Sequence, residues 1–317
     1  MSFRILGTGM FVPEKIVKND DLAQFVDTND EWIVQRVGIR ERRVATHETC
    51  TDMAAEAAKA ALDNAGVRPD ELDLIIASTV SGDYASPSLA CMVQKRIGAT
   101  CMAFDVSAAC SAFLFLLETA AGYFARGKAK KVLLVSSERL SRIVDWSDRS
   151  TCVIFGDGAG AVVLGEGDNY LDSVFNVSGN NEVLKIPYFV GSSPFNTVEA
   201  EKPYIHMQGQ ETFKYAVSSI VSDIRTLFER QGMTADDIKW IVPHQANKRI
   251  IDASARRLDI PEEKFCVNID KYGNTSSASV PIALDELNRG GKLERGDLLL
   301  LTAFGGGLSD AACIVRW

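Results

Sequence analysis

The stretch GVRPDELDLIIAST at residues 66–79 returns later in the chain as GMTADDIKWIVPHQ at residues 232–245. At this offset of 166 residues, glycine meets glycine, one aspartate meets another, and two apolar runs coincide. With the same offset and no gap, KKVLLVSS at 130–137 lies over GDLLLLTA at 296–303. A register kept over about 70 positions favours a duplicated unit, although two α/β segments can also resemble each other by chance.

The repeated segments have the composition of buried strands separated by helices. Their apolar runs are short and continuous, which is typical of strands covered on both faces. Helical patterns at 53–66 and 213–232 alternate with these runs and indicate parallel β-α-β units. The sequence therefore predicts an α/β fold with two similar halves, residues 1–165 and 166–317.

Composition narrows the class of protein. A net charge of −8 argues against nucleic acid as the main partner. The seven cysteines form neither a C-x-x-C pair nor a Cys/His cluster, so we expect no disulfide framework, no metal site and a reducing, cytoplasmic setting. The apolar stretch 108–125 approaches membrane length, but Glu118 interrupts it. This pattern predicts a central helix buried by protein rather than a membrane span.

The candidate catalytic residues lie at the ends of the predicted strands and the starts of the predicted helices. Cys110 opens the apolar helix, and its equivalent at offset 166 is Ser276 in the loop YGNTSSAS (272–279). Asn274 lies in the same loop, and His244 ends the apolar run KWIVPH. If the halves pack about a pseudo-twofold axis, these positions converge. A thiol at a helix N-terminus has its thiolate favoured by the helix dipole, and a nearby imidazole can lower its pKa further.

Each of these residues also has a purely structural interpretation. A cysteine is most often a small buried hydrophobe, and spacing alone leaves Cys110 open between the two roles. Asn274 can equally be a turn residue in YGNTS. His244 is one of three histidines, and the QAN that follows it favours function over a place in the core.

Several sequence blocks resemble the active-site motifs of one family, the β-ketoacyl-[acyl-carrier-protein] synthase III enzymes of the thiolase superfamily. The blocks are TNDEWIVQRVGIRERR (28–43), DVSAAC (105–110), DRSTCVIFGDGAGA (148–161), PHQAN (243–247), YGNTSSAS (272–279) and FGGG (304–307). They follow the family's order along essentially the whole chain. The resemblance implies the five-layered thiolase fold, with two pseudo-twofold-related β-α-β-α-β-α-β-β halves, and a homodimer.

Within that superfamily, the third catalytic residue separates the classes. Thiolases carry a second cysteine, elongating ketosynthases a second histidine and HMG-CoA synthases a glutamate, whereas this chain has Asn274. The set Cys110, His244 and Asn274 is similar to that of synthase III and of the plant chalcone-synthase type. An imidazole N–H and an amide N–H can both donate to a thioester carbonyl as negative charge develops, whereas a carboxylate would repel that charge.

The resemblance also implies a mechanism. Cys110 attacks an acyl-CoA thioester, and the backbone N–H groups of Cys110 and Gly306 hold the oxyanion. After CoA leaves, malonyl-acyl-carrier protein enters, and His244 with Asn274 stabilises the enolate formed when CO2 is lost. The enolate carbon then attacks the acyl-cysteine to give a 3-oxoacyl-carrier protein, the first step of fatty acid synthesis. No metal, no cofactor, no nucleic acid and no membrane enters this scheme.

Further sites follow from the resemblance by position. The residues implied to bind the CoA adenine are Trp32, Arg36 and Arg149, and those implied to line the acyl pocket are Ser86, Leu140 and Phe155. A basic helical face is predicted to dock the acidic carrier protein, and it comprises Lys214, Lys248, Arg249, Arg256 and Arg257. This face can also be an ordinary solvated surface.

Two departures from the family pattern leave other functions open. Family members often carry Thr-Trp-Gly after the glycine run, whereas this chain continues with LSDA at 308–311. Ser86 stands where many relatives carry a bulky side chain that reaches into the partner subunit's acyl pocket. Both leave the acyl primer open and allow a role in a specialised-metabolite pathway. The other classes are a non-catalytic acyl-binding subunit and an acyl-CoA hydrolase or acyltransferase that uses the same cysteine.

Overall fold

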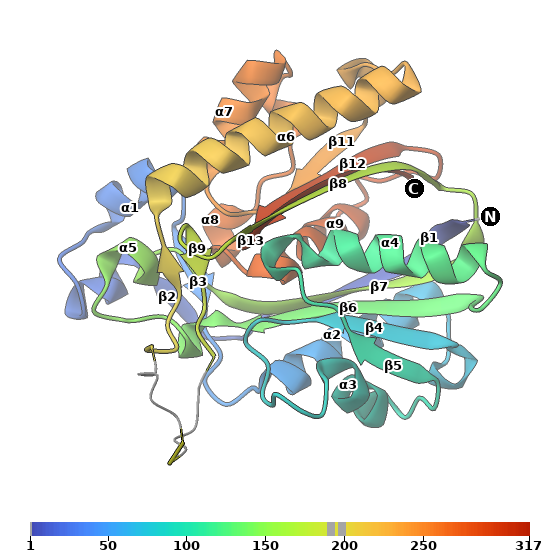
Figure 1. Cartoon of the computed structure of the whole chain (residues 1–317), viewed down its shortest axis with the longest axis horizontal. Helices are drawn as coiled ribbons and strands as arrows, with labels where there is room; N and C mark the ends of the chain where they lie inside the picture. Colours follow the sequence, from blue (N-terminus) through green and yellow to red (C-terminus); the bar gives the residue numbers. More distant parts are fainter. Residues whose placement is uncertain (1, 189–193, 196–200) are drawn as a thin grey trace.

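The computed structural model describes residues 2–188, 194–195 and 201–317, and two sheets dominate it (Figure 1). The first sheet has the strand order β1 (Ser2–Phe11), β7 (Asp157–Gly167), β6 (Lys131–Arg139), β4 (Leu74–Ser78) and β5 (Met102–Asp105). The second has the order β11 (Trp240–Pro243), β12 (Leu298–Gly305), β13 (Gly307–Arg316) and β8 (Tyr170–Asn180). Two short ribbons pair β2 (Ile16–Lys18) with β3 (Glu41–Arg43) and β9 (Leu184–Lys185) with β10 (His206–Met207).

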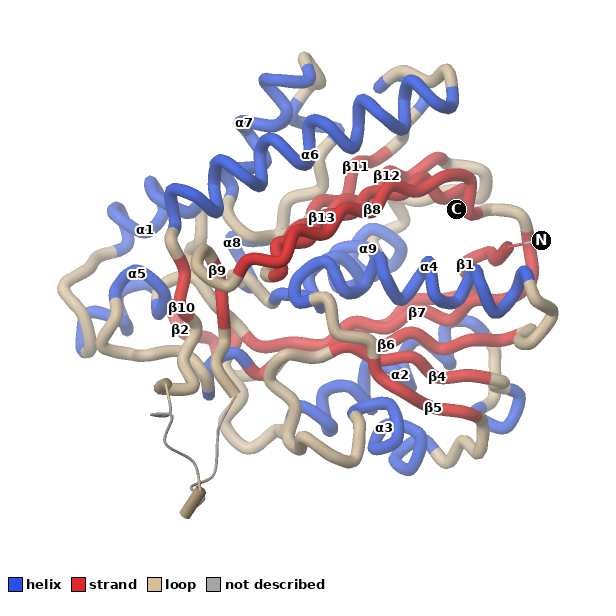
Figure 2. The backbone as a smooth tube through the Cα atoms, in the orientation of Figure 1, coloured by secondary structure: helices blue, strands red, loops and turns tan. Residues whose placement is uncertain are grey.

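Helices cover the outer face of each sheet and separate the two sheets (Figure 2). The first sheet carries α2 (Cys50–Ala65) and α3 (Leu89–Ile97), and the second carries α6 (Gly209–Gln231) and α7 (Lys248–Leu258). Between the sheets lie α4 (Ala112–Ala125) and α9 (Ser279–Arg289). The shorter helices are α1 (Asp30–Val37), α5 (Arg149–Cys152) and α8 (Ile269–Tyr272). This arrangement confirms the predicted five-layered α/β fold.

The central helix α4 confirms the prediction for the apolar stretch 108–125. Its side chains are apolar nearly all round because both sheets pack against it, and Phe113, Leu114 and Leu117 are fully buried in one cluster. Glu118 stays at the surface, where it accepts hydrogen bonds from two side chains of the second half. None of the helices in the described ranges combines the length and apolar character that crossing a bilayer requires.

The glycines that open the repeated segments end helices. Gly66 follows α2 and Gly232 follows α6, with φ angles of 63° and 61°. A residue in this left-handed region satisfies the last helical carbonyls, and glycine adopts it without a steric penalty. The repeat detected in the sequence is therefore a repeated helix stop followed by a strand.

The pairing registers correct the alignment of the two halves by one residue. Leu74 pairs with Val132 in the first sheet, and the equivalent Trp240 pairs with Leu299 in the second. The offset is therefore 166 in the first strand of each unit and 167 in the next, so the gapless alignment of 130–137 with 296–303 is wrong by one residue.

The same shift changes the equivalent of the candidate nucleophile. Two short 3₁₀ turns, η3 (Ala109–Ser111) and η7 (Ser276–Ala278), precede α4 and α9. Each turn begins on a non-glycine residue with positive φ, 47° at Ala109 and 48° at Ser276. Cys110 therefore corresponds to Ser277, and the predicted equivalence with Ser276 is wrong.

The second half is also one strand shorter than expected. In its described residues the sheet has four strands, and at the position of a fifth strand Phe265 makes a single parallel bridge with Ile241. The chain leaves the first sheet after Gly167 and enters the second at Tyr170.

Candidate active site

Cys110 lies in the turn η3, where β5 leads into α4. Part of the residue reaches solvent, while Ser111 beside it is buried. The glycine turn after β12 packs directly against it, since a Cβ built on Gly305 would stand 2.7 Å from the Cys110 amide nitrogen. The nucleophile position therefore depends on close contact between the two halves.

His244 directly follows β11 and is almost completely buried. Its backbone N–H donates to the Thr302 carbonyl at 2.7 Å, which continues the pairing with β12. Its ring meets Phe304 edge-on, with centroids 5.4 Å apart. Because Phe304 precedes Gly305 in β12, this strand brings the imidazole and the thiol to the same end of the sheet.

Ser279 occupies one of the two imidazole nitrogens. Nδ1 lies 2.6 Å from the Ser279 hydroxyl, which also accepts the backbone N–H of Gln245 at 3.3 Å. A hydroxyl has one hydrogen and two lone pairs, so both contacts fit either tautomer. We infer the tautomer in which Ser279 donates to Nδ1 and Nε2 of His244 carries the proton.

Asn274 is held at both its backbone and its side chain. Its N–H donates to the Ile154 carbonyl at 2.9 Å, and its carbonyl accepts from Gly156 at 3.0 Å. Its Oδ1 accepts the N–H of Ser276 at 2.8 Å. Because an N–H must face the oxygen, the NH2 group of Asn274 points away from Ser276, and it donates to no other residue in the described part of the chain.

Burial opposes charge on both reactive groups. Burial lowers the pKa of His244 to about 3. It raises the pKa of the Cys110 thiol to about 12, and the charge of Glu138 raises this thiol pKa further, whereas the Ser276 side chain lowers it. The expected stabilisation of a thiolate by the helix start and the imidazole is thus outweighed, because desolvation acts on the whole charge. The free site holds a neutral thiol and a neutral imidazole.

The residues after the glycine run, where this chain differs from the family pattern, connect two turns of the site. The hydroxyl of Ser309 lies 2.8 Å from that of Ser111 and donates to the Gly306 carbonyl at 3.1 Å. Ser309 therefore ties the glycine turn to the nucleophile turn. Gly306 itself has more room than Gly305, since its nearest neighbours lie 3.6 Å from a built Cβ.

Asp310 opens a buried acidic cluster between β13 and α6. It accepts the hydroxyl of Tyr215 at 2.5 Å and the amide of Asn176 at 2.7 Å, and the same amide donates to Asp223 at 3.1 Å. Burial, followed by the charge of Asp310, raises the pKa of Asp223 to about 8. At neutral pH we therefore expect a proton on Asp223.

This proton makes stability depend on pH. An unfolded Asp223 ionises near pH 4, whereas the folded one keeps its proton to about pH 8, so stability falls as pH rises through that window by up to ~1.4 kcal/mol per unit. Asp223→Asn, whose amide can still donate to Asp310, should raise the free energy of unfolding by about 2–4 kcal/mol at pH 8 and by little at pH 4. Urea unfolding at pH 4 and pH 8 measures this difference, with Asp236→Asn at the surface as the control. An equal increase in the free energy of unfolding at both pH values would contradict the prediction.

The three residues proposed to bind the CoA adenine lie together. The guanidinium carbon of Arg149 stands 4.6 Å from the centroid of the Trp32 ring, and that of Arg36 stands 5.8 Å away. Arg149 also donates to the carbonyl of Asp27 at 2.7 Å. At this separation Arg149 and Trp32 touch, so a base could lie between them only after Arg149 moves.

Two of the three residues predicted for the acyl pocket lie together. Leu140 and Phe155 are buried in one apolar cluster, which Trp32 joins at its edge. Ser86 is exposed in the loop after β4.

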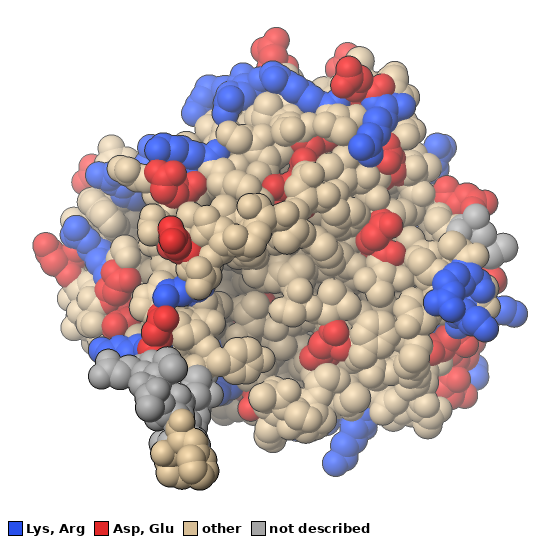
Figure 3. All heavy atoms as spheres, in the orientation of Figure 1, with Lys and Arg blue, Asp and Glu red and all other residues tan. Residues whose placement is uncertain are grey.

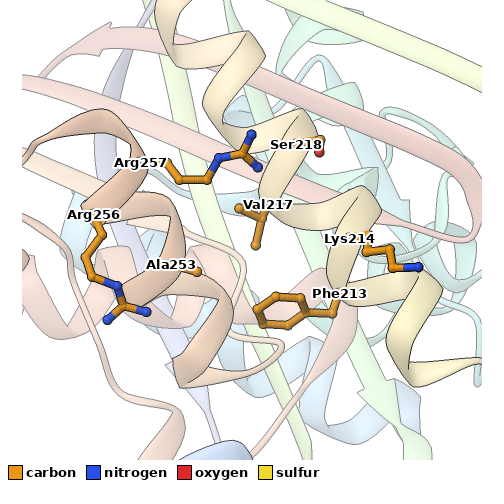
Figure 4. Close-up of a pocket in the computed structure, with 7 residues that line it drawn as sticks. All are labelled: Phe213, Lys214, Val217, Ser218, Ala253, Arg256 and Arg257. Carbon is orange, nitrogen blue, oxygen red and sulfur yellow. The ribbon is translucent and has the colours of Figure 1, made fainter.

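The predicted docking residues gather on α6 and α7. Figure 3 shows Lys and Arg side chains along the end of the molecule where Figure 1 places these helices. Lys214, Arg256 and Arg257 surround a groove of about 320 Å³ that Phe213, Val217 and Ala253 line with apolar groups (Figure 4). Lys214 is paired with Glu211 at 2.8 Å and Lys248 with Asp252 at 2.7 Å. Arg249 lies over the Phe213 ring at 5.9 Å.

Sequence reasoning missed the residues that set the state of the site. Ser279 and Gly305 lie inside the motifs YGNTSSAS and FGGG, but the sequence does not show that Ser279 contacts His244 or that Gly305 contacts Cys110. Glu138 offered one signal, a charged residue at the end of the apolar run KKVLLVSSE.

Comparison with known proteins gives a consistent picture. A family model described as 3-oxoacyl-[acyl-carrier-protein (ACP)] synthase III matches residues 104–179, and one for the C terminal part of that enzyme matches 228–317. The β-ketoacyl-[acyl-carrier-protein] synthase III of Aquifex aeolicus (strain VF5) is 47% identical over 319 residues, covering 100% of both chains. The crystal structure of the Aquifex aeolicus VF5 enzyme matches with a TM-score of 0.92, covering 99% of this chain and 100% of that one. The priming β-ketosynthase from the R1128 polyketide biosynthetic pathway matches with a TM-score of 0.91 at 38% identity, covering 99% and 96%.

Proposed function

Because this chain belongs to the β-ketoacyl-[acyl-carrier-protein] synthase III family, it is a condensing acyltransferase that initiates fatty acid synthesis, and we propose that Cys110, His244 and Asn274 perform its chemistry. The substrates are an acyl-CoA primer and malonyl-acyl-carrier protein, and the products are 3-oxoacyl-carrier protein, CO2 and CoA. The observation that carries this assignment is the position of the two side-chain donors: His244 packs on Phe304, directly before the Gly305 that contacts Cys110, and Asn274 precedes η7, which packs against η3.

The first half-reaction takes place at the glycine turn. Cys110 attacks the acyl-CoA carbonyl, and the backbone N–H groups of Cys110 and Gly306 donate to the oxyanion. Gly305 lets the turn approach the thiol closely, and Ser309 holds the two turns together. CoA then leaves and the acyl group remains on the sulfur.

The second half-reaction uses the two side-chain donors. A His244 whose pKa lies near 3 stays neutral and acts as a hydrogen-bond donor rather than as a base. Nε2 of His244 and the amide of Asn274 donate to the malonyl thioester oxygen, so the charge released with CO2 collects there. The resulting carbon nucleophile attacks the acyl-cysteine.

Release of CO2 from malonyl-carrier protein in step with primer consumption tests this function. A hydrolase would consume the primer without CO2, and an acyl-binding subunit would do neither. A second candidate is priming in a specialised pathway, because the R1128 priming ketosynthase is 38% identical, although the 47% identity to the Aquifex aeolicus synthase III favours fatty acid synthesis. A panel of acyl-CoA primers tested with malonyl-carrier protein shows which primer this enzyme prefers.

We propose that the basic face on α6 and α7 docks the carrier protein. Its arginines Arg249, Arg256 and Arg257 are exposed beside an apolar groove, which suits an acidic partner helix. The ion pairs of Lys214 and Lys248 with neighbouring carboxylates reduce what these two lysines can contribute.

Reversing one charge on this face should weaken the binding of malonyl-carrier protein but not that of malonyl-CoA. Arg249→Glu should raise the KM for malonyl-carrier protein on the order of tenfold at low salt, and less at high salt, because the attraction is screened. The KM for malonyl-CoA should change little. Lys59→Glu on α2, at the opposite outer layer, is the matched control. An equal loss with both malonyl substrates would mean that Arg249 supports the fold or the tunnel instead.

We propose a homodimer formed along β5. This strand lies at the open edge of the first sheet, and Met102 on it is 50% exposed. The nearby loop carries Tyr84, also 60% exposed, and Asp105 ties the start of α3 to β5 by accepting the N–H of Leu89 at 2.7 Å. Unpaired apolar edges are normally covered, so a second copy is the expected cover.

In such a dimer, Ser86 would face the partner's acyl pocket. A serine leaves space where a bulky residue would end the tunnel, so primers longer than acetyl should be accepted, each buried methylene adding about 0.8 kcal/mol. Ser86→Phe should restore preference for acetyl-CoA, read as the ratio of kcat/KM for hexanoyl-CoA and acetyl-CoA. If wild type already prefers acetyl-CoA and the variant does not differ, Tyr84 fills the space instead.

A further inference from the structure

A buried carboxyl group that the reaction scheme leaves unused contacts the turn η7, which packs against the nucleophile turn η3. Glu138, near the end of β6, is fully buried. It accepts hydrogen bonds from Ser81 at 2.5 Å, Ser277 at 2.7 Å and the N–H of Val80 at 3.1 Å. Among the described residues no lysine or arginine is paired with it. Burying a carboxyl group without a cation is costly, and such groups cluster at functional sites.

Ser276 lies on the turn that connects this carboxyl with the thiol, because η7 packs against both η3 and β6 and the adjacent Ser277 donates to Glu138 at 2.7 Å. Its hydroxyl is close enough to lower the pKa of both Cys110 and Glu138. Within the described part of the chain it is nevertheless buried without a standard hydrogen bond. Ser276 also adopts a φ of 48°, which is uncommon for a residue other than glycine. A strained residue with an uncommitted buried hydroxyl calls for a functional explanation.

The first half-reaction needs a proton acceptor that His244 does not provide. Nδ1 of His244 is occupied by Ser279, and Nε2 carries a proton that the second half-reaction uses. A thiol must nonetheless lose its proton as it attacks, because the thiolate is the nucleophile.

We propose that Ser276 relays the Cys110 proton to Glu138, which is the general base of acyl transfer. This inference rests on the proposed function, in which Cys110 is the nucleophile. Burial raises the pKa of Glu138 above its usual range, so it is a stronger base than an exposed carboxylate. Two alternative roles for Glu138 are tested below. In the first, Glu138 is a structural clamp that holds the loop after β4 to the loop before α9. In the second, its negative charge only repels the Cys110 thiolate.

The proton balance closes over one turnover. As the Cys110 sulfur bonds to the acyl carbon, its proton passes to the Ser276 oxygen while the Ser276 proton passes to Glu138. The bond to CoA breaks, and the CoA thiolate takes a proton from water. When the malonyl-derived carbon attacks, the acyl–sulfur bond breaks and Glu138 returns its proton through Ser276 to the Cys110 thiolate. No oxidant or metal enters the sequence.

Two separate assays of the same variants test the relay. Rapid-quench transfer from radiolabelled acetyl-CoA reports acylation of Cys110, and decarboxylation of malonyl-carrier protein reports the second site. Glu138→Gln should slow acylation by about 10²–10⁴-fold, the usual contribution of a general base, and leave decarboxylation within about threefold. Ser276→Ala should behave alike, because it keeps the backbone N–H that orients Asn274. Ser81→Ala, which removes a donor to Glu138 away from the thiol, is the control and should lose less than about tenfold.

Three results would overturn the relay. Loss of both activities in both variants would indicate a clamp, faster acylation in Glu138→Gln would indicate charge repulsion, and unchanged acylation would indicate no role. These outcomes leave the proposed function intact as long as Cys110→Ala abolishes acylation. If Cys110→Ala still accepts the acetyl group, the proposed function fails as well.

Discussion

Replacing Cys110 with alanine will abolish acyl transfer and condensation while malonyl-carrier protein continues to lose CO2. The thiol is the only group in the scheme that bonds to the acyl carbon, whereas the donors for decarboxylation lie on His244 and Asn274. Mass spectrometry after incubation with acetyl-CoA should show an adduct of one acetyl group on wild type and none on the variant. Acyl adducts on another cysteine, such as Cys101, would contradict the assignment.

The reciprocal variants should lose the other half of the reaction. His244→Ala or Asn274→Ala should still form the acyl-enzyme but decarboxylate more slowly by about 10²–10³-fold, the usual effect of removing one oxyanion donor. Ser279→Ala offers a graded comparison, since it leaves the imidazole but removes the contact that orients its proton. If His244→Ala and Asn274→Ala lost acyl transfer and decarboxylation to the same extent, the division of labour would be wrong.

A methyl group at Gly305 should block acyl transfer without any change in the reacting side chains. The built Cβ stands 2.7 Å from the amide nitrogen of Cys110 and 3.1 Å from its Cβ, closer than real side chains approach. It would displace the N–H that the oxyanion needs, so Gly305→Ala should slow acyl transfer by about 10²–10³-fold. Single-turnover acylation with acetyl-CoA measures the effect.

Gly306→Ala is the matched comparison for this variant. The substitution keeps the Gly306 N–H, and the built Cβ finds its nearest neighbours at 3.6 Å, an ordinary contact distance. We expect a loss of less than about tenfold, with both variants checked for folding by circular dichroism. Equal losses would show that the turn needs flexibility at both glycines rather than space at Gly305.

Local sequence patterns were sufficient to predict much of the fold. The helix stops at Gly66 and Gly232 and the continuous apolar strands that follow them depend on residues close together in the chain. The apolar composition of α4 likewise indicated a helix buried on all sides. Such features are readable because backbone conformation and burial impose their preferences residue by residue.

The register between the halves could not be read in this way. A one-residue difference in the intervening loops shifts Cys110 from Ser276 to Ser277, and strand pairing alone reveals it. The absence of a fifth strand from the described residues of the second half could not be read from the sequence either, because it also depends on pairing between distant segments. Loops accept insertions at little energetic cost, so sequence alignment leaves their place undetermined.

For the candidate site, the sequence by itself determined which chemical groups are present, and the tertiary structure decided their state. The types and order of Cys110, His244 and Asn274 were sufficient for the functional prediction. Their protonation was not, because the neutral thiol, the neutral imidazole and its tautomer follow from burial and from Ser279. Likewise, Glu138 meets Ser277 of the turn η7 only through folding. Desolvation and hydrogen bonding act between groups that are near in space, and only packing brings these groups together.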